Sequence, residues 1–265
     1  GIFFLIMILS CRAPKKINLL RYKDNFFMFK KDGLKKGFSR LKYISLGNKN
    51  YISFGGELRE QFQLFKNINF GDVPPGYPAI NPKQLNHRLM VHANIELGTH
   101  FRFFIQLNNT LRFFNPNLPV PQIDENQLSL HQAFAELKLK RWNFRLGRQE
   151  LLYGNHRLIT VREGPNTRLA FGGLLIKRTI KNGAIDFFAL TKVTSKKFVF
   201  DDQGFNEGLI GIYGTQYFYK RKLGVDYYAV NFQSRLRKYN YSSGFENRQT
   251  YGLRFFSNCK KINFE

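Results

Sequence analysis

From residue 51 onward the sequence alternates polar and apolar side chains with a period of two. Residues 88–97 show it clearly, with Leu89, Val91 and Ile95 on one phase and Arg88 and Glu96 on the other. Because successive side chains of a β-strand point to opposite faces, this pattern predicts strands with one apolar and one polar face. The same alternation recurs over residues 54–65, 101–111, 130–139, 142–147, 169–178, 184–192, 209–220, 225–233, 248–257 and from 261 onward.

The connections between these segments are alternately short and long. An Asn182-Gly183 hairpin turn joins two strands, whereas residues 67–83 and 115–126 are long stretches rich in Gly, Pro and Asn. Alternation alone fits a soluble β-sandwich as well as a membrane barrel. Strands of about ten residues, unequal connections and 29 Phe with 13 Tyr favour the barrel. We therefore expect an all-β, antiparallel up-and-down transmembrane β-barrel, represented here by about ten to eleven strands.

The region before the strands has a different composition. Residues 1–12 begin with an uncharged apolar run and predict a signal-peptide remnant, with a lipid anchor at Cys11 or a buried strand as alternatives. Residues 13–49 form a basic leader or linker, expected to be disordered, with a short plug as the alternative. Residues 50–265 are then the N-terminal part of the barrel domain. No apolar run is long enough for a membrane-spanning helix.

Charge and motifs narrow the function. The formal net charge of +24 indicates a polyanionic partner, and nucleic acid is one candidate. Cys11 and Cys259 provide neither a disulfide framework nor a cysteine metal site, and the five histidines lack ligand spacing. Phosphate-binding loops and nucleophile motifs are absent from the sequence. We therefore predict no catalytic residues, no metal and no cofactor.

Arginines recur on the polar phase of separate predicted strands. If the sheet closes, they share one interior with carboxylates on the same strands. Guanidinium stays charged and matches carboxylate in a bidentate manner, so such a lumen attracts anionic solutes. The arginines are Arg59, Arg88, Arg102, Arg145 and Arg254, and the counter-charges are Glu57, Glu96, Glu136 and Asp186.

Five motifs stand out along the chain: Leu41-Lys42-Tyr43-Ile44-Ser45-Leu46-Gly47, Tyr51-Ile52-Ser53-Phe54-Gly55-Gly56-Glu57-Leu58-Arg59, Leu130-His131-Gln132-Ala133-Phe134, Leu146-Gly147-Arg148-Gln149-Glu150-Leu151 with Gly154 and Arg157-Leu158, and Val161-Arg162-Glu163-Gly164-Pro165-Asn166. Together they resemble the alginate-export family of outer-membrane porins. The resemblance covers residues 41–257, and its most specific part is 146–166.

The resemblance implies a monomeric barrel of about eighteen strands in the bacterial outer membrane. An anionic, uronate-rich polysaccharide would diffuse through its arginine-lined pore. Porin-sized lumens need more strands than this sequence holds, so we expect a fragment or a truncated product. The resemblance also implies basic pore positions at Arg59, Arg88, Arg145, Arg148, Arg157 and Arg162, and acidic partners at Glu57, Glu136, Glu150 and Glu163.

Other functions remain open from the sequence. The first alternative is a general or nutrient-uptake porin for other anionic solutes. The second is a soluble basic β protein that binds nucleic acid, and an enzyme acting on polyuronate is more remote. For residues 144–166 the sequence leaves open whether the segment folds into the lumen or stands at its rim.

Overall fold

One antiparallel sheet forms the wall of the molecule. The computed structural model describes residues 17–27, 37–66, 83–114, 123–197, 202–257 and 264. Within these ranges eleven strands follow one another in sequence order, each hydrogen-bonded to the next. They are β1 (Ile44–Gly47), β2 (Asn50–Leu64), β3 (Lys83–Leu97), β4 (Phe101–Phe113), β5 (Asn126–Leu139), β6 (Trp142–Gln149), β7 (Phe171–Ile180), β8 (Gly183–Thr194), β9 (Asp202–Phe218), β10 (Leu223–Lys238) and β11 (Ser243–Ser257).

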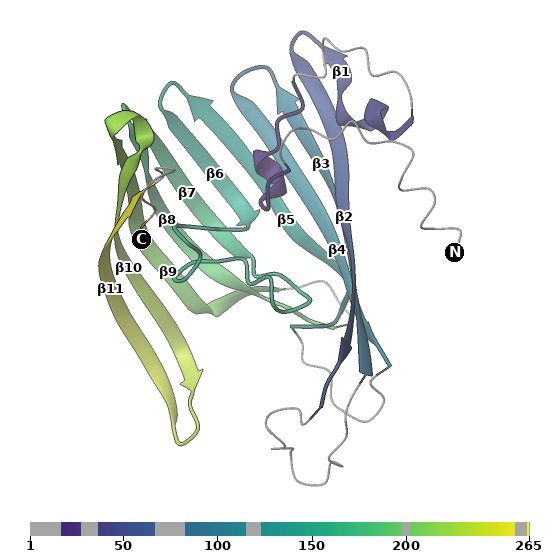
Figure 1. The fold of residues 1–265 in the computed structure, drawn as a ribbon, viewed down its shortest axis with the longest axis vertical. Coiled ribbons are helices and arrows are strands. Elements are labelled where there is room, and N and C mark those ends of the chain that lie inside the picture. Colours follow the sequence, from purple (N-terminus) through teal and green to yellow (C-terminus); the bar gives the residue numbers. More distant parts are fainter. Residues whose placement is uncertain are drawn as a thin grey trace.

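The sheet is strongly curved and open, like part of a barrel wall (Figure 1). This confirms the predicted up-and-down fold class. Three short 3₁₀ helices complete the described elements, η1 (Arg21–Lys23), η3 (Gly37–Lys42) and η5 (Tyr219–Arg221). Among the described residues, no helix is long and apolar enough to cross a membrane.

The two faces of the sheet have the reverse of the polarity expected for a soluble sandwich. On β4, Arg102 and Gln106 are buried, whereas Phe103 and Ile105 on the other phase are exposed. The same holds across β3, where Arg88 is 1% exposed and Val91 46%. A sandwich would bury the apolar phase and expose the polar one. The convex face is therefore apolar and open, which is the arrangement of a barrel wall in lipid.

Two segments cover the polar, concave face. One is residues 17–27, which include η1, and the other is the connection between β6 and β7, residues 150–170 (Figure 1). Leu20 and Tyr22 from the first segment and Val161 from the second are buried together with Phe104 and Phe134 of the wall. A second cluster packs the connection against β7–β10, and it contains Leu151, Ile159, Phe171, Leu175, Phe188, Leu190, Tyr213 and Val230. The core of the molecule thus lies inside the curve of the sheet.

Backbone geometry explains why glycine occupies position 147 on β6. Gly147 on β6 has φ +127°, and a Cβ at this position would collide with the carbonyl oxygen of Ala133 on β5. Only glycine adopts this conformation without strain and permits so close an approach. Gly147 therefore lets β6 pair with β5 up to Arg148 and with β7 up to Gln149, where the chain turns inward.

The structure also extends the predicted elements. Most strands begin or end a few residues outside the predicted limits; β10, for example, runs to Lys238 rather than Gln233. The short strand β1 lies inside the predicted leader and pairs with β2. The signal-peptide prediction for residues 1–12, both cysteines and the start of the last predicted strand at 261 lie outside the described residues.

Candidate functional site on the concave face

The connection between β6 and β7, called here the in-folded loop (residues 150–170), lies inside the curve of the sheet rather than at its rim (Figure 1). Its anchor is Arg168, whose side chain is 2% exposed. The Arg168 guanidinium reaches Glu57 of β2 at 3.2 Å, Glu150 at the start of the loop at 3.8 Å, and Glu163 within it. Arg88 of β3 bridges Glu57 at 2.7 Å and Glu163 at 2.9 Å. Wall and loop are therefore joined by one ion-pair network, in which Arg88 and Arg168 are buried and Glu163 is partly exposed.

The electrostatics of Glu163 reflect this network. Burial alone would raise the pKa of its carboxyl group, but Arg168 and Arg88 outweigh burial and hold the pKa below its ordinary value. Glu163 is therefore ionised under ordinary conditions, which keeps the loop attached to the wall.

Hydrogen bonds to carbonyl oxygens and to the Asn166 side chain hold the turn at Pro165-Asn166. The Asn166 amide nitrogen Nδ2 donates to the carbonyl oxygens of His87 (3.0 Å), Leu111 (3.2 Å) and Asp124 (3.1 Å). Arg59 donates from Nη1 to the Glu163 carbonyl at 3.0 Å and from Nη2 to Asn166 Oδ1 at 3.2 Å. Arg59 thus lies on the concave face, as its phase predicts, and holds the tip of the loop.

A second cluster surrounds Glu136 of β5. Its carboxylate lies 2.6 Å from Arg145 Nη2 and 2.7 Å from Arg102 Nη2. The Arg145 guanidinium also stacks over Tyr22, 4.1 Å from the ring centroid, and over Phe134 at 4.5 Å. Glu96 continues the cluster towards Lys138 at 3.4 Å. Arg102, Arg145 and their carboxylates lie on the predicted face, but beneath the covering segments.

A third group of polar contacts links the in-folded loop to strands β8–β11. Asp226 of β10 accepts hydrogen bonds from Tyr213 (2.7 Å) and from Arg254 Nε (2.8 Å). Tyr153 of the loop stacks on Tyr213, with centroids 4.5 Å apart, and donates to Asp186 at 2.9 Å. Burial raises the pKa of Tyr153 well above its ordinary value, and Asp186 adds to the effect. Tyr153 therefore stays neutral and serves as a donor.

An open hollow of about 350 Å³ remains between the in-folded loop and strands β7–β11. Its lining has four cations, Arg162, Lys192, Arg237 and Arg248, and a single carboxylate, Glu207. Lys192 and Arg237 hold Glu207 at 2.7 and 3.0 Å, and Arg248 lies over the ring of Phe232. The Arg248 side chain is 60% exposed. This is an open, positively charged surface with an apolar base.

The remaining predicted arginines differ in placement. Arg157 and Arg162 are exposed on the in-folded loop, and neither forms an ion pair with the described part of the chain. Arg148 pairs across the sheet with Ala133 and Gly172, on the phase opposite to Arg145, and donates to the Leu130 carbonyl at 2.7 Å. Of the predicted arginines, Arg162 is the one that lines the hollow.

Several site residues were missed in the sequence. Arg248 lies six residues before Arg254 on the same strand, so alternation places both side chains on the same polar face. This pattern could have identified Arg248. Arg237 follows a register shift between β10 and β11 after Ser234. Beyond this shift, alternation along the sequence no longer predicts which face a side chain occupies. The roles of Arg168 and Asp226 could not be predicted from neighbouring residues, because their partners are distant in the sequence.

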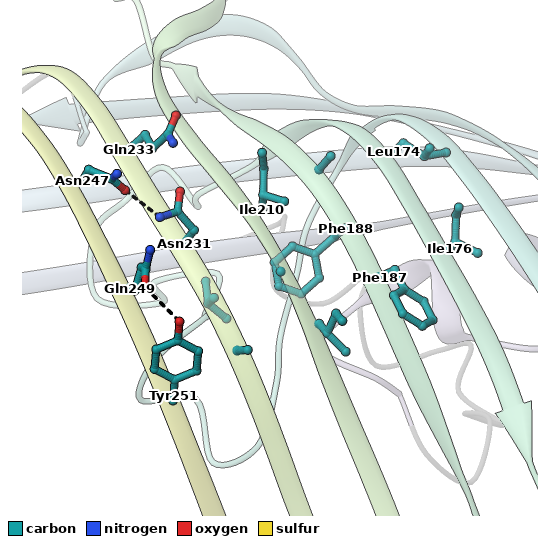
Figure 2. A pocket seen from close by; sticks show the side chains of 15 residues that line it. Leu174, Ile176, Phe187, Phe188, Ile210, Asn231, Gln233, Asn247, Gln249 and Tyr251 are labelled. Atoms are coloured by element: carbon teal, nitrogen blue, oxygen red, sulfur yellow. Dashed lines mark hydrogen bonds between the residues drawn. The ribbon is translucent and has the colours of Figure 1, made fainter.

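A larger hollow lies on the convex face and has different chemistry. It measures about 650 Å³, with Leu174, Ile176 and Ile210 on one side and amide side chains on the other. Figure 2 shows that Asn231 and Asn247, hydrogen-bonded at 2.6 Å, belong to the amide side. This surface faces outward and is separated by the sheet from the cationic lining. We place the candidate site on the concave face.

Fold and site together define a class of protein: an antiparallel barrel wall, apolar outside, with a polar and cationic interior. A family model for alginate export matches residues 50–265. The chain belongs to the alginate-export family, which comprises outer-membrane transport porins rather than enzymes. Comparison with curated proteins and with solved structures gave no match.

Proposed function

We propose that this chain forms part of an outer-membrane channel that passes an anionic, uronate-rich polysaccharide by electrostatically guided diffusion. Membership of the alginate-export family supports a polysaccharide export channel. The observation that supports guidance of an anionic polysaccharide by charge is the concave hollow, whose lining has four cations and one carboxylate. The channel would be a monomeric barrel surrounded by outer-membrane lipid, with no nucleic-acid partner.

The arginines divide into two roles under this proposal. Arg88, Arg102 and Arg145 are at most 9% exposed and paired with carboxylates, so they would hold the lumen surface in shape. Arg157, Arg162, Arg237 and Arg248 would meet the solute. Guanidinium presents a planar fork that matches a uronate carboxylate, and its charge is permanent.

Transport also requires release. Glu207 and Glu246 lie within 3.7 Å of the arginines on β10 and β11, which limits how tightly an anion is held. Conduction needs binding that is favourable enough to enter and weak enough to leave. The base formed by Leu158, Leu209 and Phe232 could receive the apolar face of a sugar ring. Cations above an apolar base fit an anionic sugar better than a bare inorganic ion.

Binding calorimetry with an oligouronate tests this proposal, with a neutral oligosaccharide of equal length as the control ligand. We expect the double variant Arg162→Gln, Arg248→Gln to weaken oligouronate binding about tenfold to a hundredfold, at about 1 kcal/mol or more per lost charged contact. The matched control Arg141→Gln removes an exposed charge at the β5–β6 turn and should change nothing. Equal affinity for the neutral and anionic ligands would contradict the proposal.

A further inference from the structure

The N-terminal segment, residues 17–27, is built into the interior of the sheet. Leu20, Tyr22 and Phe26 are 2%, 5% and 5% exposed. The segment is also braced internally, because Asn18 donates from its backbone and its side chain to Asp24 Oδ1, at 2.8 and 2.9 Å. A solvated linker would bury none of these side chains. This part of the basic leader is therefore a folded element.

Tyr22 is the centre of its contacts. Its ring packs edge-on against Phe134 and Phe104, with centroids 5.4 and 6.1 Å apart, and the Arg145 guanidinium covers it at 4.1 Å. Arg102 donates to the Tyr22 carbonyl at 2.9 Å. These contacts fix the segment to strands β4, β5 and β6 of the wall.

The same residue also reaches the in-folded loop. The Tyr22 hydroxyl donates to the carbonyl of Glu150, where the loop begins, at 3.2 Å. Leu20 and Tyr22 share a buried apolar cluster with Val161 of the loop, which is 1% exposed. Arg21 reaches Glu57 at 2.9 Å, and Glu57 also holds Arg168 at the end of the loop. The segment thus contacts the loop directly at two places and supports its anchor at a third.

We propose that residues 17–27 act as a strap inside the lumen that positions the in-folded loop, with Tyr22 as the principal positioning residue. The loop carries Arg157 and Arg162, so its position sets where these cations stand in the lumen. Without the strap, the apolar side of Val161 and Leu152 would face water, and the start of the loop would lose a hydrogen bond. The strap acts in this way whichever solute passes.

The test measures loop mobility by a nitroxide label at Gly164→Cys, in a background with Cys11→Ser and Cys259→Ser. Gly164 is exposed, and a Cβ there meets nothing within 4 Å, so the label itself is tolerated. A second label at Gly244→Cys on β11 also meets open space and lies on a strand remote from the strap. Spectra are recorded on the full-length protein in lipid bilayers.

We expect Tyr22→Ala to raise the rotational rate of the label several-fold at 164 and to leave it unchanged at 244. Tyr22→Phe keeps the ring contacts and loses the hydroxyl, so its effect should be smaller. The control Ile17→Ala, at a side chain 55% exposed on the same segment, should leave both labels unchanged. An unchanged label at 164 in Tyr22→Ala would overturn the proposal. So would equal mobilisation at both sites, because Tyr22 would then support the whole sheet rather than the loop.

Discussion

At the residue scale, the charges of the concave face fall into two populations. Arg88, Arg145 and Arg168 are buried in ion pairs with carboxylates on other elements. Arg157, Arg162 and Arg248 are exposed, and the last two line the concave hollow. A buried ion pair is costly to break because the surviving charge is left without compensation. We therefore expect the buried arginines to govern stability and the exposed ones to govern binding.

Substitution of Arg168 separates these populations. Arg168→Gln leaves Glu57, Glu150 and Glu163 beside a neutral side chain, and we expect a loss of about 3–5 kcal/mol in unfolding free energy. Arg157→Gln, on the same loop but exposed, should stay within about 0.5 kcal/mol of the parent. Denaturant unfolding of the two variants in parallel provides the measurement. Similar losses for both would refute the division.

The depressed pKa of Glu163 gives a pH prediction. A carboxyl group whose pKa is lower in the folded state than in the unfolded state stabilises the folded state at pH values above its unfolded-state pKa. This stabilisation is lost as the pH falls through the folded-state pKa. The loop should therefore remain attached at pH 5 and detach only below the ordinary glutamate range, about pH 4. Limited proteolysis of the loop across this range follows the change. Detachment near pH 6 would disagree with the ion-pair network.

At the element scale, strand faces could be predicted and the interior packing could not. The phase of Leu89, Val91 and Arg88 is a local property of one strand, so alternation placed each residue on its correct face. The position of the loop depends on contacts such as Arg88 with Glu163 and Glu57 with Arg168, 75 and 111 residues apart in the sequence. No periodicity records such pairs. The packing of residues 17–27 inside the sheet likewise depends on contacts between residues that are far apart in the sequence.

Gly147 tests the geometry of β6. Gly147→Ala places a methyl group against the Ala133 carbonyl at a strained φ, and we expect a destabilisation of about 1–3 kcal/mol. Gly164→Ala adds the same methyl group in open space and should be nearly neutral. Heat-induced mobility shifts on gels compare the two. Equal thermal stability of the two variants would show that β6 does not need glycine at this position.

At the scale of the whole molecule, the reversed polarity of the sheet predicts which surface meets lipid. Ile105 lies in the apolar part of the convex face, 45% exposed, and pairs with Ala93 and Ala133. Ile105→Arg should cost about 2–4 kcal/mol in a bilayer, as for a charge near the midplane. Gln233→Arg, on the amide side of the convex hollow, should cost about 0–1 kcal/mol. Equal costs in bilayer unfolding would argue against this orientation.

Under the proposed function, cations on the in-folded loop and on the facing wall guide an anionic polysaccharide through the lumen. Single-channel current recorded with added oligouronate measures this most directly. We expect the parent protein to show transient, salt-sensitive block by the oligouronate and little block by a neutral oligosaccharide of equal length. The double variant Arg162→Gln, Arg248→Gln should lose most of that block while its open-channel current persists. Unchanged block in this variant, or equal block by the neutral sugar, would contradict guidance of the polysaccharide by these cations.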